Sequence, residues 1–509
     1  MRGTVAPANT SARPIGLAYL REHFELHVPE PAVRSEAIDG ARSSHEFDGR
    51  YVERYPRRFE PDSLNGHLRF ALKHEPIDLH VLRRALERIG PDPIVNWVRN
   101  QPSGGYARRA WYLYESLTGE TLPLNDVAIG NYVDLADDQL QVVGTSAPSQ
   151  RHRVRDNLLG TPLYAPLIRL TPRLRDWMKA PLQLKAAQMV EGIDPALLAR
   201  ASQYLYTRET KSSYAIEREE APRNFMERFV RLLSSAGEFA MTKANLVRLQ
   251  NAIVDPRYAE SDWRTTQNYV GETRADYEEV VHYMCPKPED VPELMNSWQV
   301  SCEWLDRCHP VVAAAAASFG FVLIHPFGDG NGRIHRFLIH AILAERGFTP
   351  DNLVFPVSSV MLRHRRDYER VFDLHAEPMM PFIDHIVYGP GRAEVLNVTT
   401  DLYRFPDLTR FTEYLFACID ETIERDLAEE LGFLTRFDQA RISIREVVDI
   451  PDGRLRLLVQ LLNQNHGLLS KNKRSQFPEL TDKEIEQIED AIAHLFGGAA
   501  DQGLLDLTS

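Results

Sequence analysis

The sequence His325-Pro-Phe-Gly-Asp-Gly-Asn-Gly-Arg-Ile-His-Arg336 lies between two apolar stretches and decides the fold that we expect around it. Residues 310–324 before it and 334–346 after it carry apolar side chains at helical spacing. The segment between them holds three glycines, two histidines, two arginines, an aspartate and an asparagine. A solvated helix–loop–helix turn would explain each of these residues singly. The whole set predicts a binding or catalytic loop held between two buried helices.

The residue types of this loop suit a polyphosphate. Gly330 and Gly332 have no side chains, so backbone N–H groups can approach an anion closely. The helix that follows directs its free N–H groups to the same place. Arg333 and Arg336 are three residues apart, so one helix face can present both to phosphate oxygens. Asp329 is the kind of oxygen ligand that Mg²⁺ takes beside phosphates.

Two further residues complete the prediction for the loop. His325 titrates near neutral pH and suits a general base. Phe327 is expected to point into the core and to anchor the loop. The sequence therefore predicts a polyphosphate site with a divalent cation and a base.

The string resembles the signature of the Fic (filamentation induced by cAMP) family, His-Pro-Phe-x-Asp/Glu-Gly-Asn-Gly-Arg-x-x-Arg, at every fixed position. The resemblance implies a mostly α Fic-type helical core that transfers AMP from ATP, with Mg²⁺, to a Ser, Thr or Tyr hydroxyl of a protein. It implies that His325 deprotonates the hydroxyl and that Asp329 holds Mg²⁺. The nucleotide phosphates would be bound by Gly330, Asn331, Gly332, Arg333 and Arg336. Gly332 stands where the related death-on-curing kinases carry Lys, which favours the transferase branch.

Residues 210–220 are expected to form a helix that inhibits this site. Ser213-x-x-x-Glu217 resembles the inhibitory pattern of Fic proteins, and its spacing places both residues on one helical face. A carboxylate beside Arg336 would occupy the guanidinium and repel a γ-phosphate. Arg218 departs from the family pattern, which has Gly or Asn there. The alternative is an ordinary charged helix.

Residues 263–283 are expected to form a β-hairpin, because two runs of residues with strand propensity flank a polar segment. Gly271 is predicted to break the first run. Fic proteins carry a hairpin here, called the flap, whose edge holds an extended target segment by strand addition. By this resemblance the target is positioned by Thr265, Thr266, Gln267 and Asn268. A purely structural hairpin is the alternative.

The 509 residues are long enough for several domains, and we expect three parts. Residues 1–190 are predicted to be mainly helical, of unknown role, with an irregular stretch over 41–75. Residues 195–400 form the Fic-like catalytic domain. Residues 401–509 form a C-terminal helical module, for which a helix-turn-helix is an alternative to a plain bundle.

The composition bounds the partners and the location. A net charge of −13 disfavours non-specific binding to nucleic acid or membranes. Four irregularly spaced cysteines do not suit a disulfide framework, and the first residues show no secretory signal, so we expect a cytoplasmic protein. The expected partners are ATP and a protein substrate, which includes the chain itself, and no membrane. DNA binding and oligomerisation stay open.

Three other functions remain alternatives. The same site could remove AMP from a modified protein, with Glu217 positioning water, or it could transfer another group such as UMP or a phosphoryl. In a different class, the chain could be a nucleotide-sensing DNA-binding or adaptor protein that uses the basic cluster Lys471-Asn-Lys-Arg474.

Overall fold

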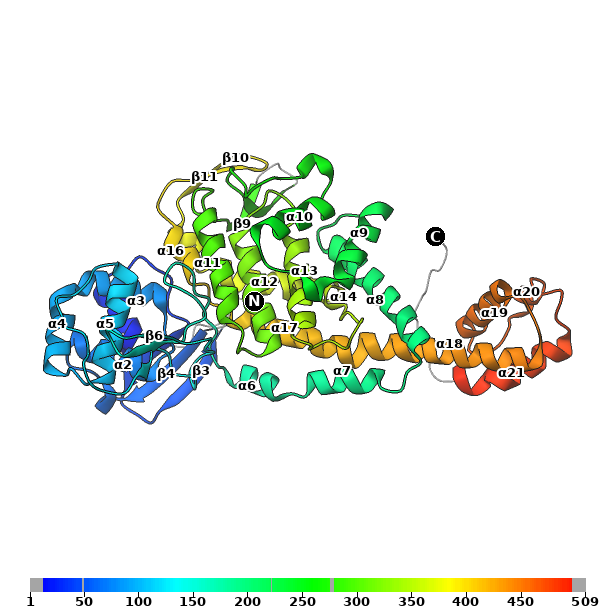
Figure 1. The fold of residues 1–509 in the computed structure, drawn as a ribbon, viewed down its shortest axis with the longest axis horizontal. Coiled ribbons are helices and arrows are strands. Elements are labelled where there is room, and N and C mark those ends of the chain that lie inside the picture. The colour runs from blue at the N-terminus through cyan, green and yellow to red at the C-terminus, as the bar shows by residue number, and fades with distance from the viewer. Residues whose placement is uncertain (1–11, 48–49, 221, 275–278, 497–509) are drawn as a thin grey trace. The chain divides into compact units, whose positions relative to one another are not determined.

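The computed structural model describes residues 12–47, 50–220, 222–274 and 279–496 (Figure 1). The fold is mostly α with small β elements, as the sequence predicts. The chain divides into two compact units. The first comprises Met1–Ala180, Thr210–Phe348 and Met361–Ala417, and the second comprises Pro181–Glu209, Thr349–Val360 and Cys418–Ser509. These divisions do not coincide with boundaries near 190 and 400.

The first 180 residues are less helical than predicted. They open with a four-stranded sheet of order β1-β2-β4-β3, in which β2 and β4 are parallel and the other pairs antiparallel. Its strands are β1 (Arg13–Ile15), β2 (Val33–Ile38), β3 (Ser43–Phe47) and β4 (Arg50–Pro56). The prediction of an irregular stretch over 41–75 is wrong for β3 and β4, and for the helix Leu64–His74 that follows them. Only small residues, Ser35 and Ala37, are buried in β2, so the sequence shows no apolar alternation.

Helices cover the rest of this region. They are α1 (Gly16–His23), α2 (Leu64–His74), α3 (Leu79–Ile89), α4 (Pro91–Asn100), α5 (Gly105–Thr118) and α6 (Pro172–Lys179). The next helix, α7 (Leu182–Val190), belongs to the second unit. A small sheet, order β5-β7-β6, lies between α5 and α6 in the chain and consists of β5 (Val133–Asp134), β6 (Ala147–Ser149) and β7 (Val154–Asp156). Phe405 packs into the core of these helices, so residues of the C-terminal half complete it.

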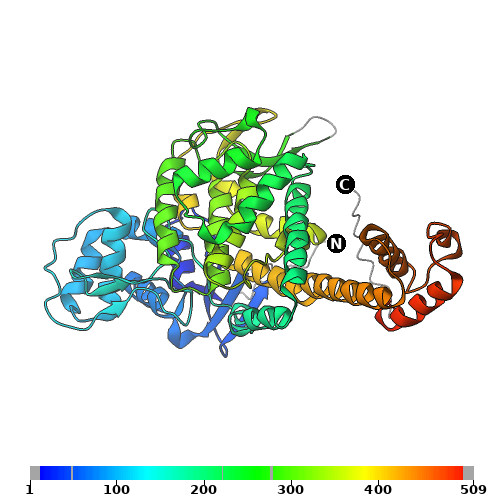
Figure 2. The same ribbon diagram turned by 45° about the vertical axis from the view of Figure 1, so that its right-hand side comes forward.

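The two helices predicted around the loop are present and lie side by side (Figures 1 and 2). They are α12 (Pro310–Ile324) and α13 (Asn331–Glu345). Every residue of α12 from Val311 to Ile324 is buried. α13 begins at Asn331, three residues earlier than its apolar pattern indicates, because Gly330 turns the chain into the helix in a left-handed conformation (φ 87°). α9 (Arg223–Ser234) and α10 (Lys243–Ile253) pack against α13, and α11 (Val291–Trp304) packs against α12. α15 (Arg365–Ala376) reaches α12 through Phe372, whose ring lies beside that of Phe319. α16 (Thr400–Arg404) comes later in the chain.

The predicted hairpin is present, with a later start. Its strands are β8 (Tyr269–Thr273) and β9 (Glu279–Met284), which pair antiparallel. The prediction that Gly271 ends the first strand is wrong, because the register shifts between Val270 and Gly271 and the strand continues. A Cβ at Gly271 would lie 2.2 Å from the Val280 carbonyl oxygen, so the bulge requires glycine there. A second hairpin consists of β10 (His385–Gly389) and β11 (Arg392–Val395).

The second unit is helical, as predicted for the end of the chain. A π-helical turn over Thr422–Leu427 leads into α18 (Ala428–Val447). α19 (Asp452–Gln464) and α21 (Asp482–Phe496) pack on α18 through Leu458, Ile488 and Ile492, with the short α20 (Lys471–Arg474) between them in the chain. Three helices contain residues of both units: α8 (Pro195–Ile216), α14 (Val357–Arg363) and α17 (Thr409–Glu421).

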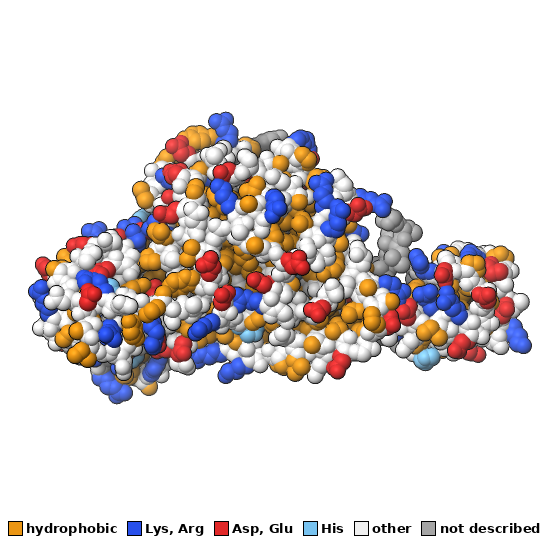
Figure 3. Space-filling model, in the orientation of Figure 1, with side chains coloured by type: hydrophobic (Ala, Val, Ile, Leu, Met, Phe, Trp, Pro, Cys, Tyr) orange, Lys and Arg blue, Asp and Glu red, His pale blue; other side chains and the backbone are white. Residues whose placement is uncertain are grey.

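Acidic and basic side chains are interspersed over the face of the molecule drawn in Figure 3. Within the described ranges, no helix combines the length and the apolar character needed to cross a bilayer.

Candidate active site

His325 ends α12 in a left-handed backbone conformation (φ 54°), which turns the chain away from the helix. Its Nδ1 lies 3.1 Å from the Val322 carbonyl oxygen. Because a carbonyl oxygen only accepts, Nδ1 carries the proton, and Nε2, which has no partner among the described residues, keeps its lone pair. Burial and the nearby Arg264 cation lower the pKa of His325 to about 4. The imidazole is therefore neutral at pH 7, as a general base must be.

The loop after His325 is held by its own side chains. The Asn331 amide donates to the Phe327 carbonyl oxygen (2.7 Å) and accepts from the Phe327 N–H (3.0 Å). Phe327 is fully buried against Trp263, which confirms the prediction that it points inward. Asn331 thus fixes the loop with its side chain. The first N–H groups of α13, from Asn331 to Arg333, have no carbonyl partner within the helix and face outward from its start.

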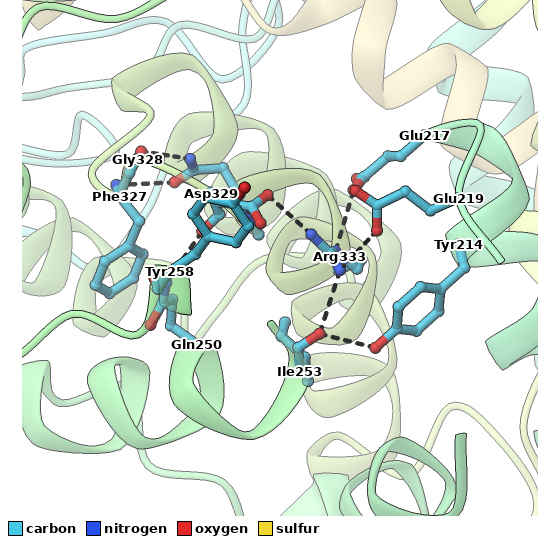
Figure 4. A network of polar contacts seen from close by, with 12 residues as sticks. Tyr214, Glu217, Glu219, Gln250, Ile253, Tyr258, Phe327, Gly328, Asp329 and Arg333 are labelled. Atoms are coloured by element: carbon cyan, nitrogen blue, oxygen red, sulfur yellow. Dashed lines mark hydrogen bonds and ion pairs between the residues drawn. The ribbon is translucent and has the colours of Figure 1, made fainter. Parts of the chain in front are cut away.

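Arg333 is surrounded by three carboxylates (Figure 4). Its guanidinium lies 2.8 Å from Asp329, 3.1 Å from Glu217 and 3.0 Å from Glu219. Its Cζ also lies 5.0 Å from the centre of the Tyr214 ring. Burial opposes the charge of Arg333, but Glu217 and the other carboxylates raise the net pKa of its guanidinium. Three carboxylates therefore bind the Arg333 guanidinium, a cation that could otherwise bind phosphate oxygens.

Arg336 is held by both residues of the predicted inhibitory pattern. Its Nε donates to Ser213 Oγ (2.8 Å), and its Nη2 donates to the Ser213 carbonyl oxygen (2.8 Å) and to Glu217 Oε1 (2.7 Å). Only 1% of Arg336 is exposed. Glu217 therefore bridges Arg333 and Arg336. Gly332 permits this approach, since a Cβ there would lie 2.1 Å from Glu217 Oε1.

Arg218, which departs from the inhibitory pattern, has a backbone role. It adopts a left-handed conformation (φ 60°) just after α8. Its N–H donates to the Ala215 carbonyl oxygen, and the Glu219 N–H donates to the Tyr214 carbonyl oxygen. This pair of bonds is the Schellman motif, in which the residue at the Arg218 position favours glycine. The family preference for Gly or Asn there follows from the same geometry.

Asp329 fits a role in holding Mg²⁺ that arrives with a nucleotide. Its Oδ1 accepts from the Gly330 N–H (2.6 Å) and from Arg333, which leaves Oδ2 for another partner. In the described part of the chain, no group of three or more acidic, histidine or cysteine side chains could hold a metal ion. A single carboxylate suits Mg²⁺, which keeps waters and takes its remaining ligands from substrate phosphates.

The structure brings only part of the predicted flap set to the loop. Asn268 reaches the loop, where its amide lies 3.4 Å from the Gly328 carbonyl oxygen. Gln267 instead donates to the Cys285 carbonyl oxygen and ties the two sides of the hairpin base. Thr265 and Thr266 are exposed before β8 begins. All four therefore precede the strand that was expected to contain them.

Three contacts at the site have no clear signal in the sequence. Glu219 belongs to a run of glutamates after α8, which does not single it out. Glu260 accepts from the Gly328 N–H (3.1 Å), and Arg264 donates to the His325 carbonyl oxygen (2.8 Å). Both bind backbone groups of a distant segment, and such contacts leave no spacing pattern to read.

The site lies in a segment that is similar to a known family. Residues 240–343 match the model of the Fic/DOC family. The chain is 39% identical over 93 residues to a "Protein adenylyltransferase Fic" of Nematostella vectensis and 32% identical over 156 residues to one of Aedes aegypti. These matches cover 17% and 30% of this chain, and 19% and 26% of the two relatives.

Among solved structures, a Fic family protein from Desulfovibrio desulfuricans is similar with a TM-score of 0.39 and 19% identity, over 59% of this chain and 90% of that one. The family model covers the loop that holds His325, Asp329 and Arg333. The part of this chain that carries the site, residues 240–343, is therefore similar to the Fic/DOC family.

Proposed function

We propose that this chain is a protein adenylyltransferase that moves AMP from ATP to a Ser, Thr or Tyr hydroxyl of a protein. The observation that carries the proposal is a neutral His325, with a free Nε2, beside the N-terminus of α13 and its two buried arginines. The names of the sequence relatives support the same chemistry, although the chain covers 19% and 26% of those relatives' lengths.

The proposed reaction is a displacement at the α-phosphorus. Nε2 of His325 takes the proton of the target hydroxyl as its oxygen bonds to the α-phosphorus. The bond to the oxygen that bridges the α- and β-phosphates breaks, and pyrophosphate leaves with the electron pair. The N–H groups at the start of α13 and the Arg333 guanidinium would stabilise charge on the phosphates. Asp329 would hold Mg²⁺, which neutralises phosphate charge when bound.

Inhibition by Glu217 belongs to the proposal. The carboxylate lies against Arg333 and Arg336, the two cations that phosphates would otherwise contact. A γ-phosphate entering beside Arg336 would face the negative charge of Glu217. ATP would then bind in a pose unsuited to transfer, and removal of Glu217 would release the site.

The test uses the Glu217→Gly protein with Mg²⁺ and ATP labelled at either the α- or the γ-phosphate. Label retained on protein from α alone is expected, with auto-labelling above that of the wild type. Loss of this label in Glu217→Gly/His325→Ala, with ATP still bound, would support the base. Equal labelling with and without His325 would refute that assignment, and retention from γ alone would identify a kinase.

Further assays and one contact in the structure separate the alternatives. If Glu217 positions water for removal of AMP, Glu217→Gly should lose the release of AMP from a modified protein. Transfer of UMP would appear with UTP labelled at the α-phosphate. A DNA-binding role through Lys471, Lys473 and Arg474 is weakened because Arg474 faces Asp482 and Glu489, each at 3.5 Å. We also propose a cytoplasmic location and a protein partner, on the basis of the sequence.

A further inference from the structure

Arg264 is a buried cation whose hydrogen bonds all go to backbone carbonyl groups. It is 3% exposed. Its Nε donates to the His325 carbonyl oxygen (2.8 Å), its Nη1 to that of Thr266 (2.8 Å) and its Nη2 to that of Pro286 (2.5 Å). Its own N–H donates to the Pro326 carbonyl oxygen (2.9 Å). Among the described residues, no carboxylate forms an ion pair with it.

These carbonyl groups belong to two different elements. Thr266 precedes β8 and Pro286 follows β9, so together they form the base of the flap. His325, the proposed general base, and Pro326 begin the loop between α12 and α13. One planar guanidinium therefore joins both sides of the flap to the backbone of His325. Asn268 and Glu260 add bonds to Gly328, so the same segment supports the loop at a second point.

A buried charge without an ion pair is costly to maintain. A neutral side chain has too few donors to bind three carbonyl groups that come from separate segments. A guanidinium offers five donors in a fixed plane. The arrangement therefore suits a group whose purpose is to fix the mutual position of three backbone segments.

We propose that Arg264 is a positioning residue that fixes the base of the flap relative to His325, so that a target segment on the flap presents its hydroxyl to Nε2 at one distance. The proposal rests on the proposed transfer reaction. It assigns to Arg264 an effect on the rate of transfer, and not on the binding of ATP, because none of its contacts involves Arg333, Arg336 or the start of α13.

The charge of Arg264 also acts on the base. After burial, Arg264 is the main group that lowers the pKa of His325, while Asp329 and the Val322 carbonyl raise it. Burial lowers the pKa of Arg264 itself, but a guanidinium remains protonated at pH 7. Loss of the Arg264 charge should therefore raise the pKa of His325, an effect that a purely structural role would not produce.

The test compares Arg264→Gln, Arg264→Lys and Arg109→Gln, each in the Glu217→Gly protein. Arg109 is a matched control, because it is a buried arginine (8% exposed) in α5. The measurements are the single-turnover rate of auto-labelling, the ATP dissociation constant by calorimetry, and the pKa of His325 by NMR of labelled histidine. The His325 signal is assigned by its loss in His325→Ala.

Arg264→Gln is expected to lower the labelling rate about 100-fold, as a misplacement of about 1 Å can do, with the ATP dissociation constant changed less than about threefold. The pKa of His325 should rise above about 4 toward 6.5. Arg109→Gln should leave the labelling rate, the ATP dissociation constant and the pKa of His325 unchanged. A rate within about twofold of the parent, or an equal loss of ATP binding, would overturn the proposal.

Arg264→Lys covers the case in which the glutamine variant does not fold. Its ammonium keeps the charge but cannot reach all three carbonyl oxygens, so the pKa of His325 should stay low while the rate falls at least about tenfold. A full rate with Lys would contradict positioning. If the parent itself transfers no label, the transfer reaction fails separately, and an unchanged pKa of His325 in Arg264→Gln would still overturn the assignment of Arg264.

Discussion

His325 is a base whose protonation is set by its surroundings rather than by the ordinary value for histidine. Its Nδ1–H is held by the Val322 carbonyl oxygen, and burial with Arg264 lowers its pKa to about 4. A protonated imidazole cannot accept the hydroxyl proton, so activity should be lost as pH falls through that pKa and not through 6.5.

The single-turnover labelling rate of Glu217→Gly is therefore expected to show its acidic limb near pH 4 to 5 and to be flat with respect to His325 from about pH 5.5 to 7.5. Circular dichroism at each pH serves as the control for folding. An acidic limb between pH 6 and 7 in a folded protein would contradict this prediction. It would show that the surroundings of His325 during transfer differ from those in the chain without ATP.

Arg218 offers a separate test of the inhibitory contact. A left-handed conformation costs a residue with a Cβ about 1 kcal/mol or more relative to glycine. Arg218→Gly should therefore stabilise the Schellman turn that presents Glu217, and auto-labelling of the otherwise native chain should fall about fivefold. Arg218→Ala keeps the Cβ and removes the guanidinium, so it should change labelling little. Increased labelling with Gly would contradict the backbone explanation.

At the scale of elements, the sequence predicts α12, the loop and α13 well, because a buried helix pair needs long periodic apolar runs. The resemblance to the Fic inhibitory pattern implies the Glu217 contact with Arg336, and the spacing of four places Ser213 on the same helical face. The sequence misses the strands of residues 33–56. In β2 the buried positions, Ser35 and Ala37, are small, so no apolar alternation marks the strand. The sequence also does not predict the contacts of Glu219, Glu260 and Arg264, because their partners are remote in the chain.

The packing of α12 depends on Gly320. A Cβ there would lie 2.3 Å from the Tyr164 hydroxyl and 3.3 Å from the Trp298 ring. Gly320→Ala should therefore lower the free energy of unfolding by about 1–3 kcal/mol, despite the higher helix propensity of alanine. The buried Tyr164 hydroxyl has no hydrogen-bond partner among the described residues, so Tyr164→Phe should be neutral or stabilising.

The double variant tests this contact directly. Tyr164→Phe should recover most of the loss caused by Gly320→Ala, with a coupling of about 0.5–3 kcal/mol, measured by thermal unfolding. Gly453→Ala, where an added methyl meets nothing within 4 Å, should cause no loss. Additive effects of the two substitutions would show that the hydroxyl is not what limits the space beside Gly320.

At the scale of the whole molecule, residues before 181 and the catalytic core belong to one compact unit. The Leu167 N–H donates to the Pro406 carbonyl oxygen, and the Leu408 N–H donates to the Leu167 carbonyl oxygen. Ser301 of α11 donates to the Leu159 carbonyl oxygen (2.5 Å). The region of unknown role is thus part of the scaffold that supports α12, whatever else it does.

Removal of residues 1–180 should therefore damage the catalytic core. It would expose the fully buried Phe405 and leave the backbone groups beside Leu408 without their partners, at a cost of several kcal/mol. We expect the shortened Glu217→Gly chain to unfold at least about 10 °C lower, or without a cooperative transition, and to lose ATP binding in calorimetry. Removal of residues 449–509 is the matched control, because α19 and α21 share a core with α18 in the second unit. That deletion should preserve ATP binding. A chain of residues 181–509 that binds ATP and melts like the parent would show that the catalytic domain folds without its N-terminal region.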